Sequence, residues 1–282
     1  MMARTFPVRC ATFVLSTGRC GTQWLARAFA RVGEECLRVE HEPLQNNYRP
    51  RQMLGAGDPE ALDAAARRKI TAHLATIERE LGSRSYFETG HPCWSTLPWT
   101  ARRLASRVRI VHLVRHPVPT ACSWVSHGAF VPPLLPHVAT KELISPWDAG
   151  VRWPEYRERW PSLTPFEKSL VYWAEVNAFA LRFERHCGLP WLRLRYEELF
   201  EPASDALLQL GRFLGLPDSV MTRLDRAEHV DRHRFVLAQP PELDRMGRHE
   251  AIRQIAARLG YDVEDFSLAR LAERFLLPPC SA

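Results

Sequence analysis

The chain has 282 residues, of which 46% are hydrophobic and 25% charged, and these ordinary globular values exclude wholesale disorder and a fibrous array. No apolar run reaches the roughly 18 residues of a transmembrane helix, and the apolar start at 10–15 is too short for the core of a signal peptide. Lys and Arg total 38 against 32 Asp and Glu, a formal net charge of +6 carried almost entirely by arginine. This bias fits binding of a phosphate or sulfate group, and fits a GC-rich coding sequence equally well.

The cysteine spacing and the absence of a long basic run limit the expected partners and the expected cellular location. The seven cysteines are widely spaced and form no C-x-x-C pair, so we expect neither a disulfide framework nor a zinc site, and we expect a cytoplasmic location. The chain contains no six-residue basic run, so a nucleic-acid partner is not supported.

Strands alternate with helices along the chain, which is typical of an α/β domain with a central parallel sheet flanked by helices. We treat residues 1–282 as one such domain. Apolar runs rich in β-branched residues predict strands at 11–15 and 108–114, and a third strand candidate lies at 191–196. Helical apolar spacings predict helices from Thr22, over 59–81 with a stop at Gly82, and over 203–214.

Residues 128–165 depart from this alternation. The segment holds seven prolines and three tryptophans, and that density of proline prevents a long regular helix. We therefore expect an irregular excursion from the sheet, whose aromatic residues either pack down onto the domain or line a pocket.

The loop between the first strand and the first helix reads Ser16-Thr17-Gly18-Arg19-Cys20-Gly21-Thr22-Gln23-Trp24. A loop in this position directs several backbone N–H groups at one point, where the helix dipole adds partial positive charge. Its two glycines allow close backbone approach, Thr22 offers a hydroxyl and Arg19 a fixed charge. The loop therefore predicts a phosphate-binding site, although the Gly-Lys of a P-loop is missing. The alternative is a glycine-containing turn without a ligand.

A second candidate anchor follows the strand at 108–114. Arg115 ends that strand, and Ser123 comes eight residues later in a predicted helix. An arginine and a serine placed in this way can hold a second phosphate. The two anchors together indicate a ligand with separated phosphate groups.

These motifs resemble those of the sulfotransferases that use 3′-phosphoadenosine 5′-phosphosulfate (PAPS). Residues 19–24 are similar to the loop of that family that binds the 5′-phosphosulfate, and Arg115 and Ser123 reproduce its arginine–serine spacing for the 3′-phosphate. The run Leu-Arg-Tyr-Glu-Glu-Leu at 194–199 and Phe-Leu-Gly-Leu at 213–216 resemble two further family elements. The resemblance covers scattered blocks between residues 10 and 216 and implies the P-loop-NTPase-like sulfotransferase fold.

The resemblance also implies roles for individual residues. Those that would contact the nucleotide are, for the phosphosulfate, Arg19 with the amides of Cys20, Gly21, Thr22 and Gln23, for the 3′-phosphate, Arg115 and Ser123, and for the adenine, Trp24 and Tyr196. One family element is missing, a glycine-flanked Arg-Lys pair near the C-terminus. Arg232 and Arg234 are candidate substitutes, and a solvated charged turn is the simpler interpretation of them.

Two residues compete for the role of general base. Glu42 precedes Pro43 and resembles the glutamate of several carbohydrate and bacterial sulfotransferases. His91 resembles the catalytic histidine of the cytosolic enzymes, but the lysine two positions before that histidine is Thr89 here. We favour Glu42, keep His91 as the alternative, and leave a shared role open. His41 and Glu88 are candidate supporting residues.

The resemblance therefore implies an enzyme that moves the sulfuryl group of PAPS to a hydroxyl or amine of a small-molecule or carbohydrate acceptor, releasing PAP, without a metal. In-line sulfuryl transfer depends mainly on positioning and charge neutralisation, with Arg19 as a further catalytic residue at the leaving group. A P-loop-type nucleotide kinase is the enzyme alternative, disfavoured by the missing Gly-Lys and acidic metal ligand. A non-catalytic PAP- or nucleotide-binding module is the other alternative. The acceptor and the oligomeric state are not predicted.

Overall fold

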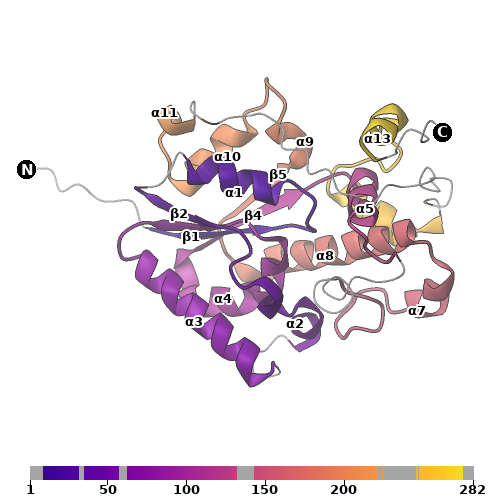
Figure 1. Ribbon diagram of the computed structural model, residues 1–282, viewed down its shortest axis with the longest axis horizontal. Coiled ribbons are helices and arrows are strands. Elements are labelled where there is room, and N and C mark those ends of the chain that lie inside the picture. Colours follow the sequence, from indigo (N-terminus) through magenta and orange to yellow (C-terminus); the bar gives the residue numbers. More distant parts are fainter. Residues whose placement is uncertain are drawn as a thin grey trace, which may run out of the picture.

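Five parallel strands form the centre of the molecule in the order β2-β3-β1-β4-β5 (Figure 1). The strands are β1 (Ala11–Leu15), β2 (Leu37–Glu40), β3 (Ser85–Glu88), β4 (Val108–Val114) and β5 (Trp191–Arg195). The computed structural model describes residues 9–31, 35–56, 62–131, 143–221, 224, 246 and 248–275. Arg232, Arg234 and residues 132–142 of the excursion lie outside the described residues.

The helices cover both faces of this sheet (Figure 1). Helix α1, which follows β1, lies on one face with α10. The opposite face carries α3, α4 and α8, which lie on the connections that step across the sheet in the other direction. Because parallel crossovers are right-handed, connections of opposite direction must use opposite faces. The bounds are α1 (Thr22–Ala30), α3 (Ala64–Glu80), α4 (Leu97–Leu104), α8 (Pro165–Cys187) and α10 (Ala206–Leu214).

Alternation along β1 divides the core into two clusters. Phe13 and Leu15 join the apolar residues of α3, α4 and α8, whereas Val14 joins those of α1 and α10. All three side chains are almost fully buried. A strand with both faces apolar is what a central parallel strand requires.

A third apolar cluster lies at the end of the sheet where the strands finish. Helix α5 (Pro117–Ser126) packs against α8, and α12 (Glu250–Arg258) and α13 (Leu268–Phe275) complete the cluster. The shorter helices are η1 (Gln45–Tyr48), α2 (Pro50–Ala56), η3 (His91–Thr96), η4 (Ala105–Arg107), α7 (Tyr156–Arg159), η5 (Trp160–Ser162), α9 (Tyr196–Leu199) and α11 (Asp218–Met221). None of the helices in the described ranges is long and apolar enough to cross a membrane.

The expected α/β architecture is confirmed, and β1 and β4 have the bounds that their apolar runs predict. The helix expected over 203–214 begins three residues later, after Asp205. The sequence interpretation missed the short strands β2 and β3 and the 23-residue helix α8. Helix α8 carries a readable start signal, because Thr164 and Glu167 form a capping box around Pro165.

The described part of the excursion is irregular, as expected, and contains only two short helical turns, α7 and η5. Its three tryptophans differ. Trp160 is buried and packs against Phe130, Trp153 lines a pocket, and Trp147 is 52% exposed. Packing and pocket lining, offered as alternatives above, both occur.

Candidate active site

The predicted site residues lie where β1 and β4 end side by side. The chain leaves β1 into α1 on one face of the sheet, whereas after β4 it passes through α5 at the end of the sheet and then enters α8 on the other face (Figure 1). Two neighbouring strands whose connections diverge leave a crevice at their carboxyl ends, the usual ligand position in open α/β sheets.

The loop after β1 has an unusual backbone. Gly18, Arg19 and Gly21 have φ angles of 76°, 58° and 80°, in the left-handed region that glycine adopts readily and arginine rarely does. A Cβ atom built on Gly18 would lie 2.8 Å from the ring of Trp124, so this position has no room for a side chain. Gly21 gives α1 no side-chain cap, and no acidic residue stands in the first turn. These first-turn N–H groups suit an anion.

Arg19, Arg115 and Ser123 form one cluster beside this loop. Arg19 Nε donates a 3.0 Å hydrogen bond to Ser123 Oγ, and Arg115 Nη1 donates a 2.8 Å bond to the carbonyl of Arg19. Both predicted phosphate anchors are thus in direct contact.

Arg115 is the more informative of the two arginines. Arg115 is 5% exposed, and its guanidinium lies 4.2 Å from the centre of the Tyr196 ring. The buried Nε atom has no hydrogen-bond acceptor within the described part of the chain. An unsatisfied buried donor on a cation is costly. This atom therefore fits a site for an anionic group.

The remaining loop residues contribute unequally. Cys20 is fully buried, with its thiol directed at the carbonyl of Gly18 and the hydroxyl of Thr17, and burial raises the pKa of the Cys20 thiol to about 11. It fills the loop interior, so only its amide could meet a ligand. Thr22 is buried and Gln23 is half-buried.

The two residues expected at the adenine are largely covered. Trp24 is 6% exposed and packs edge-on against Phe200, with ring centres 4.9 Å apart. Tyr196 packs against the same Phe200 ring at 5.1 Å. Phe200, half-buried between them, was missed, although its place directly after the Tyr-Glu-Glu-Leu run was a usable signal.

The two candidate bases contact each other. His91 Nδ1 and Glu42 Oε1 are 3.0 Å apart, and the side chains are 8% and 30% exposed respectively. Glu42 has a left-handed φ of 49°. A Cβ atom on Gly90 would lie 2.5 Å from Glu42 Cγ, so the absence of a side chain at position 90 lets the pair form.

The charges around Glu42 keep it ionised at neutral pH. Burial acts to raise the pKa of Glu42, but the hydrogen bond and charge of His91, with a contribution from His41, outweigh burial and lower that pKa to about 2. His41 lies 3.8 Å from Glu42 Oε1 and bonds Thr89 Oγ1 through Nδ1 at 3.1 Å. One carboxylate thus stands between two imidazoles.

Trp124 contacts both the loop after β1 and His91, one of the two candidate general bases. Its Nε1 donates a 3.1 Å hydrogen bond to the carbonyl of Thr17, and its ring meets the His91 ring edge-on at 5.4 Å. A Cβ on Gly18 would come within 2.9 Å of the same His91 ring. The candidate bases therefore lie against the predicted phosphate loop. Trp124 was missed, although it directly follows Ser123.

Two carboxylates support these elements from behind, Glu88, which is buried, and Glu197, whose residue is exposed. Glu197 accepts hydrogen bonds from the His116 amide at 2.9 Å and from the Tyr261 hydroxyl at 2.8 Å, which fixes the turn after β4. Glu88 bonds Tyr48 at 2.6 Å and His73 at 2.9 Å at the end of β3. Glu88 thus supports the strand that leads to His91, while His41 contacts Glu42 itself. Within the described ranges no three His, Cys, Asp or Glu side chains gather as metal ligands.

Comparison with known proteins identifies the fold. No family model matches the chain, and no curated protein matches its sequence. A sulfotransferase from Alicyclobacillus acidocaldarius matches in structure with a TM-score of 0.52 and 16% identity, over 94% of this chain and 99% of that one. A sulfotransferase domain from the curacin biosynthetic pathway matches with a TM-score of 0.51 and 16% identity, over 92% of this chain and 100% of that one. The chain has the sulfotransferase fold that its sequence motifs predict.

Proposed function

We propose that the protein is a sulfotransferase that transfers the sulfuryl group of PAPS to a hydroxyl or amine of a small-molecule or carbohydrate acceptor. One observation carries the proposal: the Arg19–Arg115–Ser123 cluster lies beside the Glu42–His91 pair at the carboxyl ends of neighbouring strands. A cluster of cationic donors suits the phosphate groups, and an adjacent carboxylate suits removal of a proton.

The residues fit the nucleotide in two respects. Arg115 Nε is the orphaned donor that a 3′-phosphate would satisfy, and the uncapped start of α1 offers N–H groups to the phosphosulfate. Ser123 bonds Arg19 directly. We expect this bond to open when the nucleotide binds, so that Ser123 turns to the 3′-phosphate and Arg19 to the phosphosulfate.

In the proposed mechanism the bound donor supplies an electrophilic sulfuryl group on a phosphate leaving group. Arg19 neutralises the negative charge that builds on that phosphate as the bond to sulfur breaks. Glu42 takes the proton of the acceptor as the new bond to sulfur forms. His91 donates through Nδ1 to Glu42 Oε1, which leaves Oε2 to receive the proton and fixes the direction of the carboxylate.

The choice of Glu42 over His91 follows from access. The side chain of Glu42 is 30% exposed and that of His91 only 8%, so the carboxylate is the group that an entering acceptor meets. The low pKa of Glu42 makes it a weak base when His91 is charged. A neutral His91 that donates through Nδ1 orients the carboxylate without lowering its pKa by charge, so the carboxylate is then more basic.

The acceptor would enter between the segment after Glu42 and the excursion. Arg51 on α2 holds the two together, because its guanidinium contacts Asp148 at 2.9 Å. We expect the protein to act in the cytoplasm, as the cysteine spacing predicts.

The test is a thermal-shift comparison of PAP, 5′-AMP, ADP and magnesium-ATP. A ligand at 100 times its Kd adds about 2.7 kcal/mol, which is a rise in Tm of roughly 5 °C or more for a chain of this size. We expect that rise with PAP, little with 5′-AMP, and none with PAP in Arg115→Ala. Arg103→Ala, at an exposed arginine on α4, should keep the full shift and serves as the matched control.

Other results would overturn the proposal. Equal shifts with PAP and 5′-AMP would mean that no 3′-phosphate is recognised. A shift with magnesium-ATP alone would favour the kinase. A shift with PAP but no turnover of PAPS across a broad acceptor panel would favour the non-catalytic module.

A further inference from the structure

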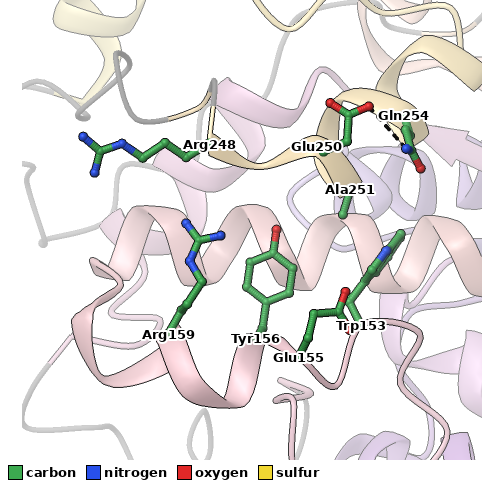
Figure 2. Close-up of a pocket in the computed structure, with 8 residues that line it drawn as sticks. All are labelled: Trp153, Glu155, Tyr156, Arg159, Arg248, Glu250, Ala251 and Gln254. Atoms are coloured by element: carbon green, nitrogen blue, oxygen red, sulfur yellow. Dashed lines mark hydrogen bonds between the residues drawn. The ribbon is translucent and has the colours of Figure 1, made fainter.

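A cavity of about 270 Å³ lies between the excursion and helix α12, away from the candidate active site (Figure 2). Eight residues line it: Trp153, Glu155, Tyr156, Arg159, Arg248, Glu250, Ala251 and Gln254. The candidate active site is built from the loop after β1 and from the ends of β2, β3 and β4. The two sites share no lining residue.

The cavity is chemically asymmetric. Arg159 and Arg248 extend at one end, and Glu250 and Gln254 stand at the other, where Gln254 Nε2 donates a 3.2 Å hydrogen bond to Glu250 (Figure 2). The Tyr156 ring lies between the two ends. Arginine guanidinium groups match the planar geometry of carboxylates and the oxygens of sulfate. One end therefore suits an anion and the other a hydrogen-bond donor.

The aromatic wall is fixed from behind by a buried polar chain. Tyr156 Oη is 3.1 Å from His249 Nδ1, and His249 Nε2 is 3.2 Å from Glu167 Oε1. The Tyr156 and His249 rings are stacked at 5.7 Å with an interplanar angle of 19°. His249 is fully buried and Glu167 is 3% exposed. Burying such groups is costly unless they are bonded, and here each bond serves to orient Tyr156.

A second buried carboxylate fixes the other aromatic residue. Glu175, 6% exposed on α8, accepts hydrogen bonds from the backbone N–H groups of Arg152 and Trp153 at 2.8 and 2.9 Å. Trp153 and Tyr156 are therefore held by two separate acidic residues of one long helix. A wall ordered before a ligand arrives loses less entropy on binding.

We propose that this cavity is a binding site for a small ring-shaped anion. Its acidic group lies between Arg159 and Arg248, its ring against Tyr156 and Trp153, and a hydrogen-bond donor at its far end meets Glu250. The volume is slightly below the range of drug-sized pockets, so the ligand is compact. This inference goes beyond the proposed function and does not depend on it.

The test uses 4-acetamidobenzoate, which has a carboxylate, a flat ring and an amide N–H donor at the far end. It has no hydroxyl group, so it does not imitate a hydroxyl acceptor. Isothermal titration of the full chain should give one site with a Kd below about 1 mM. Binding should weaken at least tenfold in the double variant Arg159→Gln/Arg248→Gln. Arg258→Gln, at an exposed arginine at the far end of α12, should bind as the wild type does.

A second probe tests whether binding depends on the negative charge of the ligand. The neutral analogue 4-acetamidobenzamide should bind at least tenfold more weakly than the acid. No binding of the acid at 10 mM, or equal binding to the wild type and the double variant, would overturn the proposal. The PAP thermal shift should be the same in the double variant, so failure of this site and failure of the proposed function give different results.

Discussion

Two of the glutamate–histidine pairs in the described part of the chain have nearly equal separations but lie in very different settings. Glu42 and His91 are 3.0 Å apart at the ends of neighbouring strands, with Glu42 30% exposed on a left-handed backbone. Glu167 and His249 are 3.2 Å apart with side chains 4% and 0% exposed. The second glutamate also closes the capping box of α8. In our proposal a pair of this kind does not by itself mark a reactive site, and what distinguishes Glu42 and His91 is access to solvent and position beside the loop after β1.

The largest effect should come from removing the exposed carboxylate. Glu42→Gln keeps the size of the side chain but loses the base, so kcat should fall by about 10²–10⁴-fold. The PAP thermal shift should stay within 1 °C or so of the wild-type value, because Glu42 does not bind the nucleotide in our proposal. Steady-state rates with PAPS and an identified acceptor provide the measurement. Full activity in this variant would move the role of base to His91.

The same substitution in the buried Glu167–His249 pair should lower stability and leave the rate nearly unchanged. Glu167→Gln weakens the bonds to His249 and Thr164, and we expect a loss of about 1–3 kcal/mol of stability with kcat changed less than about twofold. Chemical denaturation and the same rate assay check this. A fall in kcat comparable with that of Glu42→Gln, in a variant that is still folded, would contradict the distinction between the pairs.

Substitutions of His91 should have a smaller effect on the rate, and they test whether His91 orients Glu42 or itself takes the proton. Because His91 lowers the pKa of Glu42, His91→Ala should move the acid limb of the pH–rate profile upward, toward the ordinary glutamate pKa. The rate should fall by about tenfold to a hundredfold through misplacement of the carboxylate. His91→Asn retains an N–H donor and should recover most of that loss. An asparagine variant as slow as the alanine variant would identify His91 as the base.

The smallest effect concerns stability at low pH. Burial lowers the pKa of His249, which also faces Arg159 and Arg248, although Glu167 opposes this. His249 thus stays neutral in the folded state, whereas in the unfolded state it takes up a proton below about pH 6.5. The free energy of unfolding therefore falls as the pH falls. His249→Gln should remove at most about 1 kcal/mol of the decline between pH 7.5 and 5.5. Melting curves at both pH values test this, and an unchanged decline would contradict it.

The sequence predicted local features better than contacts across the fold. The glycine-containing loop after β1 and the Arg115–Ser123 spacing are readable because each is confined to a few residues beside a strong apolar strand. The contact between Glu42 and His91 joins residues 49 positions apart, and no local pattern reveals it. Helix α8 was missed because apolar residues surround most of it, which weakens helical periodicity. The burial of Trp24 depends on Phe200, far along the chain, and was equally hidden.

Gly90 imposes a steric requirement on the candidate site, although it has no reactive group of its own. The space beside Glu42 Cγ is filled by main chain alone, and one methyl group there would separate the carboxylate from the imidazole. Selection for proton transfer would therefore act on a position whose only contribution is the absence of a side chain. In such a site the volume left empty by one residue is as much a determinant of reactivity as the charge supplied by its neighbours.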